Sequence, residues 1–202
     1  MEPRMFQTVT RILRLQSPAR ETTHGMETSD PQRLDFLAYA PEYLVAGLLP
    51  LEADRMTDLL NAADELELID PLVQWLVDGR VLATESMSIP RSHLVAVKAG
   101  SPRGDHARRH PTRQVAVGAG SGGYLMHGFL HIRRGGDPAI DLGRRPPMIP
   151  LTDATIRFSV GRDTRVDEAE TLIVNRDIVD WIRPLSEQEF APMIDRHLKR
   201  AG

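Results

Sequence analysis

One short pattern of residues occurs twice in this chain, as Y-L-V-A-G-L-L-P-L at 43–51 and as Y-L-M-H-G-F-L-H-I at 124–132. On a strand, successive side chains point to opposite faces of the sheet. In both copies the face that starts with the tyrosine is apolar throughout, whereas the opposite faces differ. The apolar faces comprise Tyr43, Val45, Gly47, Leu49 and Leu51 in the first copy, and Tyr124, Met126, Gly128, Leu130 and Ile132 in the second. Agreement along one face predicts two related strands, each with one buried side.

The similarity continues on both sides of this pattern. Upstream, at the same offset of 81 positions (124 − 43), Leu34 and Phe36 correspond to Val115 and Val117. Downstream the offset grows to 83, which a two-residue insertion within 133–138 explains. At this offset the matches are Asp58-Leu59 with Asp141-Leu142, Asp70 with Asp153 and Val77 with Val160, and a later block matches residues 94–98 with 172–176. Matches that keep their order favour an internal duplication; the alternative is two unrelated hairpins of similar composition.

On this basis the sequence divides into five parts. A leader at 1–31, partly helical or flexible, precedes a first small β-barrel repeat at 32–98. A polar linker that contains Pro and Gly follows at 99–112, and then a second small β-barrel repeat at 113–184. A C-terminal helix is expected at 185–202, because Ser186 and Glu189 have capping-box spacing and Phe190 begins an apolar helical face.

The predicted fold is all-β, with five short strands in each repeat. In the second repeat these strands are expected near 114–119, 124–132, 148–151, 154–160 and 171–183. Gly47 and Gly128 lie in the middle of their strands and predict a bend or bulge that curls each sheet. Segment 54–66 favours a helix, whereas its counterpart G-D-P-A-I-D-L-G-R-R-P-P at 136–147 does not.

Composition excludes several classes of protein. The 202 residues include no cysteine, which removes disulfides, thiolate nucleophiles and cysteine-ligated metals. The net charge of −3 gives no overall attraction to nucleic acid or to an anionic membrane, so such binding would need a local patch. No apolar run approaches the roughly 18 residues of a transmembrane helix. A cytoplasmic location is expected.

Together these features resemble the Sm-like family. The resemblance rests on short curled sheets with a mid-strand glycine, on the D-L-L-N of Asp58 to Asn61, and on L-I-V-N-R-D-I-V-D-W-I at 172–182. It implies two tandem, diverged, five-stranded Sm-like small barrels with helical ends. The chain is also similar to uncharacterised bacterial domains with an R-x-T-D-L-L-N element followed by L-T-D-A, here 55–61 and 151–154.

In the Sm-like family, RNA is bound by an asparagine of one motif and an Arg-Gly of another. The resemblance therefore implies Asn61, Lys98 and Arg176 as nucleic-acid-binding residues in an alternative interpretation. The pattern departs from the family, because Arg176 is followed by Asp177 and the second repeat has Gly143 where the asparagine would fall. Neither repeat keeps both halves of a nucleotide pocket, so the resemblance implies fold more than activity.

Candidate partner-binding residues lie in the linker and on one strand face. The linker carries Arg103, Arg108 and Arg109, which can contact an acidic protein or phosphate groups but have no interleaved aromatic residue for base stacking. On a strand, His127 and His131 share a face but stand about 13 Å apart at about 3.3 Å per residue. That separation is too large for one metal ion, so the two histidines are interpreted as partner contacts and no metal site is predicted.

No catalytic or cofactor motif is complete. G-A-G-S-G-G at 118–123 matches a dinucleotide-binding pattern, but a strand follows it where that pattern requires a helix, so a hairpin turn is expected instead. The chain has no G-x-S-x-G, no H-E-x-x-H and no P-loop lysine. We therefore expect a protein that is not an enzyme and needs no cofactor.

The favoured function is that of an accessory or scaffold subunit in a larger bacterial assembly. Small curled sheets leave edges that another chain can extend by strand addition. Other protein subunits, or a second copy of this chain, are therefore the expected partners, and nucleic acid is the less favoured one. Trp75 and Trp181, in strand-like segments of the two repeats, are expected in the core or as contact anchors.

Overall fold

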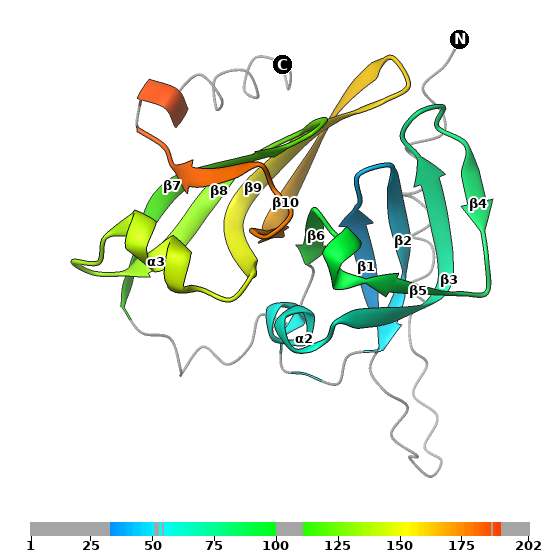
Figure 1. The fold of residues 1–202 in the computed structure, drawn as a ribbon, viewed down its shortest axis with the longest axis horizontal. Coiled ribbons are helices and arrows are strands. Elements are labelled where there is room, and N and C mark those ends of the chain that lie inside the picture. Colours follow the sequence, from blue (N-terminus) through cyan, green and yellow to red (C-terminus); the bar gives the residue numbers. More distant parts are fainter. Residues whose placement is uncertain (1–32, 51–52, 54, 100–110, 187, 191–202) are drawn as a thin grey trace, which may run out of the picture.

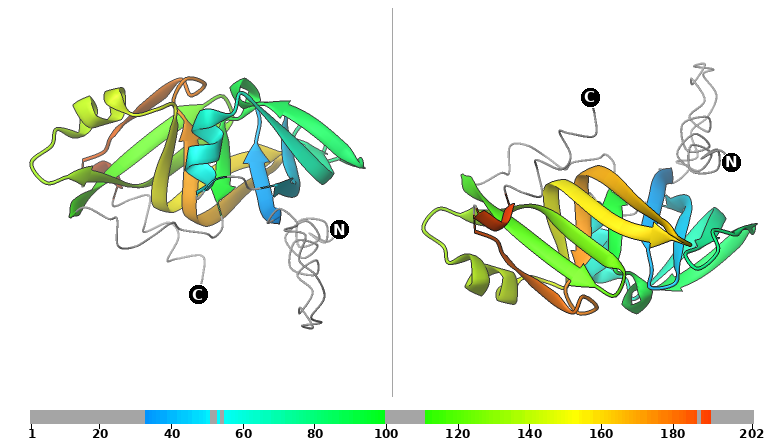
Figure 2. Two further views of the ribbon diagram at one scale, coloured as in Figure 1. Left: turned by 90° about the horizontal axis from the view of Figure 1, so that it is seen from below. Right: turned by 90° about the horizontal axis from the view of Figure 1, so that it is seen from above.

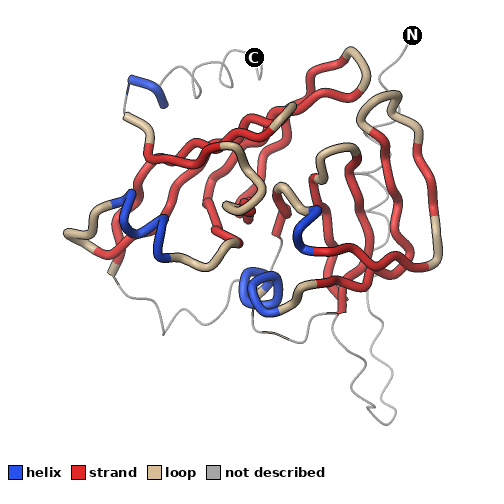
Figure 3. The backbone as a smooth tube through the Cα atoms, viewed as in Figure 1, coloured by secondary structure: helices blue, strands red, loops and turns tan. Residues whose placement is uncertain are grey.

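In a computed structural model of the chain, residues 33–50, 53, 55–99, 111–186 and 188–190 are described. They form a mostly β structure in which eleven strands make one antiparallel sheet, with the few helices at its periphery (Figure 1, Figure 3). The all-β prediction is confirmed at this level. The predicted leader at 1–31 and residues 100–110 of the predicted linker lie outside the described residues.

The strands fall into two halves. The first half contains β1 (Arg33–Tyr39), β2 (Tyr43–Pro50), α2 (Met56–Ala62), β3 (Glu65–Trp75), β4 (Val81–Ala83), β5 (Ser86–Pro90), the 3-10 helix η1 (Arg91–His93) and β6 (Ala96–Ala99). The second half contains β7 (Thr112–Ser121), β8 (Tyr124–Arg133), α3 (Pro138–Arg144), β9 (Met148–Val160), β10 (Asp163–Asn175) and β11 (Trp181–Pro184). Figure 2 shows the two halves side by side, with β6 and β10 between them.

The two halves have the same order of strands. In the first half the order is β6-β1-β2-β3, with β4 and β5 paired along the far side of β3. In the second half it is β11-β7-β8-β9-β10, and the long strand β10 occupies the place of both β4 and β5. The halves are joined because β10 pairs with β6, which makes the sheet continuous. The repeated topology agrees with an internal duplication.

The glycine in each repeated strand lies at a bulge, as the sequence predicts. The β2–β3 register shifts between Ala46 and Leu48, and the β8–β9 register shifts between His127 and Phe129. A Cβ on Gly47 would lie 3.2 Å from the Ile69 carbonyl oxygen, and one on Gly128 would lie 2.9 Å from the Ala154 Cβ. Both positions therefore need a residue without a side chain, because the neighbouring strand approaches so closely.

The opposing strands carry a matching irregularity. Among the described residues, Asp70 (φ 50°) and Asp153 (φ 47°) are the non-glycine residues with positive φ. Aspartate tolerates this left-handed conformation better than most residues do. The two aspartates lie 83 positions apart (153 − 70), which is the offset that the sequence comparison assigns to them. The same local geometry therefore recurs in both halves, down to single residues.

The prediction that 136–147 lacks a helix is wrong, because Pro138–Arg144 forms α3. Asp137 caps this helix, since its carboxylate accepts hydrogen bonds from the backbone N–H groups of Ala139 and Ile140. Proline is well suited to the first helical position, where no intrahelical N–H is needed. The glycine and prolines of this segment suggested a loop, but they lie at the ends of the helix and not in its middle.

The predicted match of 94–98 with 172–176 is also wrong. The ladder pairs Leu172 with Leu151 in the second half and Met87 with Leu68 in the first. Leu151 and Leu68 are counterparts at the offset of 83, so residues 172–176 are the counterparts of residues 87–91. The offset here is 85 (172 − 87), and at the same offset β6 corresponds to β11. Short apolar runs align in several registers, and the sequence comparison placed this block at an offset of 78 (172 − 94) instead of 85.

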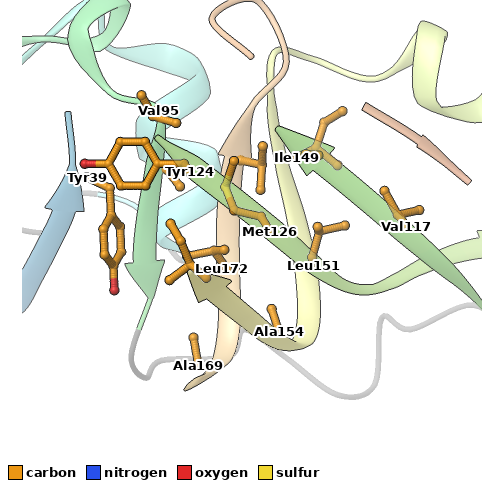
Figure 4. Close-up of a cluster of buried hydrophobic side chains, with 14 of the residues drawn as sticks. Tyr39, Val95, Val117, Tyr124, Met126, Ile149, Leu151, Ala154, Ala169 and Leu172 are labelled. Atoms are coloured by element: carbon orange, nitrogen blue, oxygen red, sulfur yellow. The ribbon is translucent and has the colours of Figure 1, made fainter. Parts of the chain in front are cut away.

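Two hydrophobic cores lie on opposite faces of the central strands. The first-half core includes Phe36, Val45, Leu60, Leu68, Ile89, Leu94 and Val97, and it also takes in Met148 and Ile173 of the second half. The second-half core includes Val117, Met126, Leu130, Ile156, Phe158, Leu172 and Val174, and it also takes in Tyr39, Leu44, Val95 and Ala96 of the first half. Figure 4 shows part of this second cluster, where side chains of both halves lie together. Neither core is therefore built from one half alone.

The expected capping box at the C-terminal end is present. The Glu189 carboxylate accepts hydrogen bonds from the Ser186 N–H and hydroxyl, each at 2.9 Å, and also from the Arg183 guanidinium. These donors lower the pKa of Glu189 to about 2, with the Arg183 hydrogen bond as the largest cause. Residues 188–190 are helical, and the rest of the predicted helix at 191–202 lies outside the described residues.

We predict that Gly128→Ala destabilises the fold by about 1–3 kcal/mol, because the added Cβ overpacks against β9. Gly123→Ala is the matched control, since nothing lies within 4 Å of its added Cβ. The control should change stability by less than about 0.5 kcal/mol. Urea unfolding of both variants measures the difference, and equal stabilities would contradict the role given to Gly128.

The lowered pKa of Glu189 predicts acid release of the capping box. A carboxyl with a depressed folded-state pKa contributes stability above its ordinary value of 4.5 and loses it as the pH falls toward about 2. The Glu189 side-chain carbon signal, followed by NMR, should therefore titrate near pH 2. In the Arg183→Ala variant the midpoint should move back toward 4.5, and an unchanged midpoint would contradict the assignment.

Candidate protein-binding edges

The pairing of β6 with β10, called the inter-repeat joint below, shows how one sheet edge of this fold accepts another. Thr171 faces Ala99, Leu172 faces Lys98, Ile173 faces Val97 and Val174 faces Ala96 in an antiparallel ladder. The Asn175 N–H donates to the Val95 carbonyl oxygen at 3.0 Å, which extends the ladder by one more bond. Strand addition at an edge is therefore a contact that this chain already makes internally.

Polar side chains strengthen the inter-repeat joint on one side. The Asn61 side chain donates to the Met148 carbonyl oxygen at 3.1 Å and accepts from the Met148 N–H at 3.0 Å. The Asn175 side chain, which is 2% exposed, donates to the Arg91 carbonyl oxygen at 3.1 Å. Each amide satisfies backbone groups of the opposite half, so these contacts fix the register as well as the distance.

Two tyrosines complete the contacts between the halves. The Tyr39 hydroxyl donates to the Asp167 carboxylate at 2.8 Å, and the Tyr124 hydroxyl donates to the Ala40 carbonyl oxygen at 2.6 Å. Their rings meet edge to face, with centroids 6.0 Å apart, and lie close together in Figure 4. Burial raises the pKa of both tyrosines, and the Asp167 charge raises that of Tyr39 further, so both hydroxyls stay protonated as donors.

The two matched arginines cap the two helices in the same way. Arg91 donates to the carbonyl oxygens of Leu60 and Asn61 at the end of α2. Arg176, 85 positions later (176 − 91), donates to the carbonyl oxygens of Leu142, Gly143 and Arg145 at the end of α3. The last carbonyls of a helix lack intrahelical partners, and a guanidinium with several donors satisfies them. Arg176 therefore has a structural role that its sequence context did not reveal.

The three residues of the RNA-binding interpretation lie in different settings. Asn61 is engaged with Met148 across the inter-repeat joint, and Arg176 is engaged with α3. Lys98 is half-buried on β6, where it lies between Leu37 of β1 and Leu172 of β10. Asn61 and Arg176 thus lie in different halves, and their polar side-chain groups bond to the protein backbone, at β9 and at the end of α3.

The candidate partner-binding histidines are both engaged within the fold. His127 is 8% exposed, and its ring meets Phe190 edge to face at 5.7 Å. His131 lies within hydrogen-bond distance of the Thr152 hydroxyl at 2.9 Å and of the Thr112 hydroxyl at 3.3 Å. Arg103, Arg108 and Arg109 lie outside the described residues.

The glycine-rich segment 118–123 forms the end of β7 and a hairpin turn into β8, as expected. Its glycines leave room for the side chains of Trp181 and Leu185, which follow β10 in the chain. A Cβ on Gly120 would lie 2.5 Å from the Trp181 Nε1, and one on Gly118 would lie 3.1 Å from Leu185. Trp181 is 38% exposed and packs on this backbone, with the Arg183 guanidinium 5.7 Å from its ring.

Trp75 is half-buried against Tyr43, with ring centroids 5.7 Å apart.

The sequence analysis missed an exposed apolar edge at the outer end of the first half. Val77, Val81 and Leu82 are 80%, 40% and 58% exposed, and they lie on β4 and the turn before it. At the offset of 85, Leu82 corresponds to Asp167, whose carboxylate accepts the Tyr39 hydroxyl at the inter-repeat joint. The position that makes a carboxylate contact in the second half therefore carries an exposed leucine in the first, and only the correct register of the duplication could have revealed this.

The backbone of β4 is also open on its outer side. The Trp75 N–H donates to the Arg80 carbonyl oxygen, and the Thr84 N–H donates to the Pro71 carbonyl oxygen. Because hydrogen bonding alternates along an antiparallel strand, Val81 and Ala83 direct their N–H and C=O groups away from β3. In the described part of the chain, β4 ends the sheet order.

Within the described ranges, no cluster of three or more histidine, aspartate or glutamate residues could hold a metal ion. No helix of these ranges is long and apolar enough to cross a membrane. Comparison of the chain with protein-family models, with curated proteins and with solved structures gave no match. The candidate site therefore rests on the geometry of the chain itself.

We predict that Asn61→Ala destabilises the protein by about 1–3 kcal/mol, because the buried N–H and C=O of Met148 lose their partner. Asp58→Ala on the same helix is the control, since that side chain is exposed and should change stability by less than about 0.5 kcal/mol. Thermal unfolding of the two variants compares them directly. An Asn61 variant as stable as the control would show that the amide does not hold the halves together.

Proposed function

We propose that this protein is a non-enzymatic accessory or scaffold subunit of a larger bacterial assembly and binds another protein through its β4 edge. The observation that carries the proposal is the open apolar strand at 81–83, with Val77 beside it. Its partner presents an extended, apolar segment that pairs with the outward backbone groups of Val81 and Ala83. Exposed apolar surface at an unpaired edge is costly in water, and a binding partner removes that cost.

The inter-repeat joint supports this mode of binding. There, β6 pairs with residues 171–174 of β10, the counterpart of β5, and the Tyr39 hydroxyl reaches Asp167, the counterpart of Leu82 on β4. The same type of strand at the other end of the sheet has no described neighbour beyond β3. A partner strand at β4 would form the same type of antiparallel edge pairing, on the segment next to the one whose counterpart the joint uses.

We also propose that each half is a diverged Sm-like small barrel. The shared strand order, with six strands in the first half because β4 and β5 take the place of β10, and five in the second, supports this assignment, as does the short helix between the second and third strands. The alternative function, Sm-like RNA binding, has less support, because the side chains of Asn61 and Arg176 form hydrogen bonds with backbone carbonyl groups of the protein.

A matched pair of surface variants tests the proposed role of β4. Leu82 is 58% exposed on β4, and Ile140 is 55% exposed on the distant helix α3. Leu82→Lys places a charge on the docking edge and should abolish recovery of the protein in a larger particle from its own source. Ile140→Lys adds the same charge elsewhere and should leave that particle intact. Native mass after gentle purification is the measurement.

Nuclease treatment separates the two functions. A particle that keeps its mass after nuclease and is lost in Leu82→Lys supports protein binding through β4. Loss of the particle's mass after nuclease treatment would instead establish RNA binding, if the affinity of the protein for RNA also falls as the salt concentration rises and falls in the Lys98→Ala variant. A particle unaffected by Leu82→Lys would refute the β4 edge as the docking site.

A further inference from the structure

The inter-repeat joint has a defined pattern of backbone pairing. The N–H of Asn175 donates to the carbonyl oxygen of Val95. Because pairing alternates along an antiparallel ladder, the hydrogen-bonded positions on β6 are 95, 97 and 99, and those on β10 are 171, 173 and 175. Val95, just before β6, contributes only its carbonyl oxygen, because its N–H donates to Tyr39. The other five positions carry N–H groups that face the joint.

Among the described residues, the same two edges recur without a paired strand at the outer ends of the duplication. At the offset of 85, the β10 positions correspond to Ser86, Ser88 and Pro90 on β5. The Asp70 N–H donates to the Glu85 carbonyl oxygen, so the inward positions of this strand are odd-numbered and these three even-numbered residues face outward. In the described part of the chain, no strand pairs with this side of β5.

The outer edge of β11 is the counterpart of the joint edge of β6. At the same offset, the β6 positions correspond to Asp180, Ile182 and Pro184. The Leu185 N–H donates to the Ala116 carbonyl oxygen of β7, so positions 181, 183 and 185 face inward and 182 and 184 face outward. A second copy of the chain could therefore approach head to tail, with its β5 against this β11.

Proline occupies one outward donor position on each of these edges. Pro90 replaces Asn175, and Pro184 replaces Ala99. Proline has no N–H group, and it is tolerated at a sheet edge only where its nitrogen faces away from the ladder. Pro90 removes both the backbone donor and the side-chain amide that Asn175 supplies at the joint.

The polar side chains of the joint are absent from the outer ends as well. The matched arginines bond to Leu60 and Asn61 in one half and to Leu142 and Gly143 in the other, which aligns the two helices at an offset of 82 (143 − 61). Gly143 therefore takes the place of Asn61, and the paired hydrogen bonds to Met148 have no equivalent. Leu82 takes the place of Asp167, and Gly120 that of Tyr39, so the tyrosine–carboxylate contact is lost on both sides. The inner and outer edges share a backbone fold but not the groups that would join them.

We propose that Pro90, Pro184 and Gly143 determine the binding specificity of the outer edges by excluding a second copy of this chain. The two halves join once, inside the chain, and the molecule does not extend into rings or filaments. Head-to-tail contacts between identical subunits otherwise generate such assemblies. This specificity is independent of the role proposed for β4, since it concerns the outer sides of β5 and β11.

The test restores the residues of the inner joint at the outer ends. The triple variant Pro90→Asn, Gly143→Asn and Pro184→Ala should fold, because residue 90 has φ −65° and ψ 137° and a Cβ at 143 meets no atom within 4 Å. Sedimentation velocity over a concentration series should give the mass of one chain for the natural sequence and at least twice that mass for the triple variant. Pro138→Ala, which removes a proline from the start of α3, should behave as the natural sequence does.

A crosslinking experiment checks the geometry of that association. The chain has no cysteine, so Ser88→Cys in one preparation and Ile182→Cys in another give a single thiol each. A short bifunctional thiol reagent should join them in the triple-variant background and not in the natural one. Equal crosslinking in both backgrounds, or a triple variant that keeps the mass of one chain while its circular dichroism and Tm are those of a folded protein, would overturn the proposal.

Discussion

The β6–β10 pairing is the contact on which the rest of this structure depends. These two strands carry residues of both hydrophobic cores, because their side chains alternate between the two faces of the sheet. Val97 and Ile173 belong to the first-half core, whereas Ala96 and Leu172 belong to the second-half core. Separating the strands would open both cores at once, which is why the halves behave in this account as one folded unit and not as two linked domains.

Duplication followed by divergence explains which features recur and which do not. The bulge glycines, the left-handed aspartates and the helix-capping arginines are present in both halves, since each half needs them to curve its own sheet. The contacts that join the halves occur once. Asn61, Asn175 and Tyr39 have no counterparts at the outer ends, where glycine or proline stands instead. Matched positions therefore carry joining groups inside the chain and none of these groups at the outer ends of its described part.

Much of the fold could be predicted from the repeated strand, because Gly47 and Gly128 fall at the bulges and the 83-residue offset pairs Asp70 with Asp153. Helix α3 could not, since its start depends on a cap from Asp137 and a proline that also suits a loop. The register of the last strands was also beyond the sequence, because apolar runs such as 172–174 fit several alignments equally well.

The candidate site was harder to predict than the fold. Arg176 and Asn61 carry the residue types of an RNA-binding pocket, and only their hydrogen-bond partners reveal that they serve helix capping and the inter-repeat joint. His127 looked exposed on a strand face, but Phe190 covers it from beyond the last strand. The β4 edge gave no signal by itself, because Val81 to Ala83 form a short apolar run of ordinary composition, and only the register shows that Leu82 stands where Asp167 contacts Tyr39.

Hydrogen exchange at the joint tests the central claim that both halves form one cooperative unit. The amides of Val97 and Ile173 bond across the two strands, so in this account they exchange only through global unfolding. Their free energy of opening should then equal the free energy of unfolding measured with denaturant. Amides at the joint that exchange far faster than those of Leu68 and Ile156, inside the two cores, would show that the halves separate without unfolding and would contradict the account.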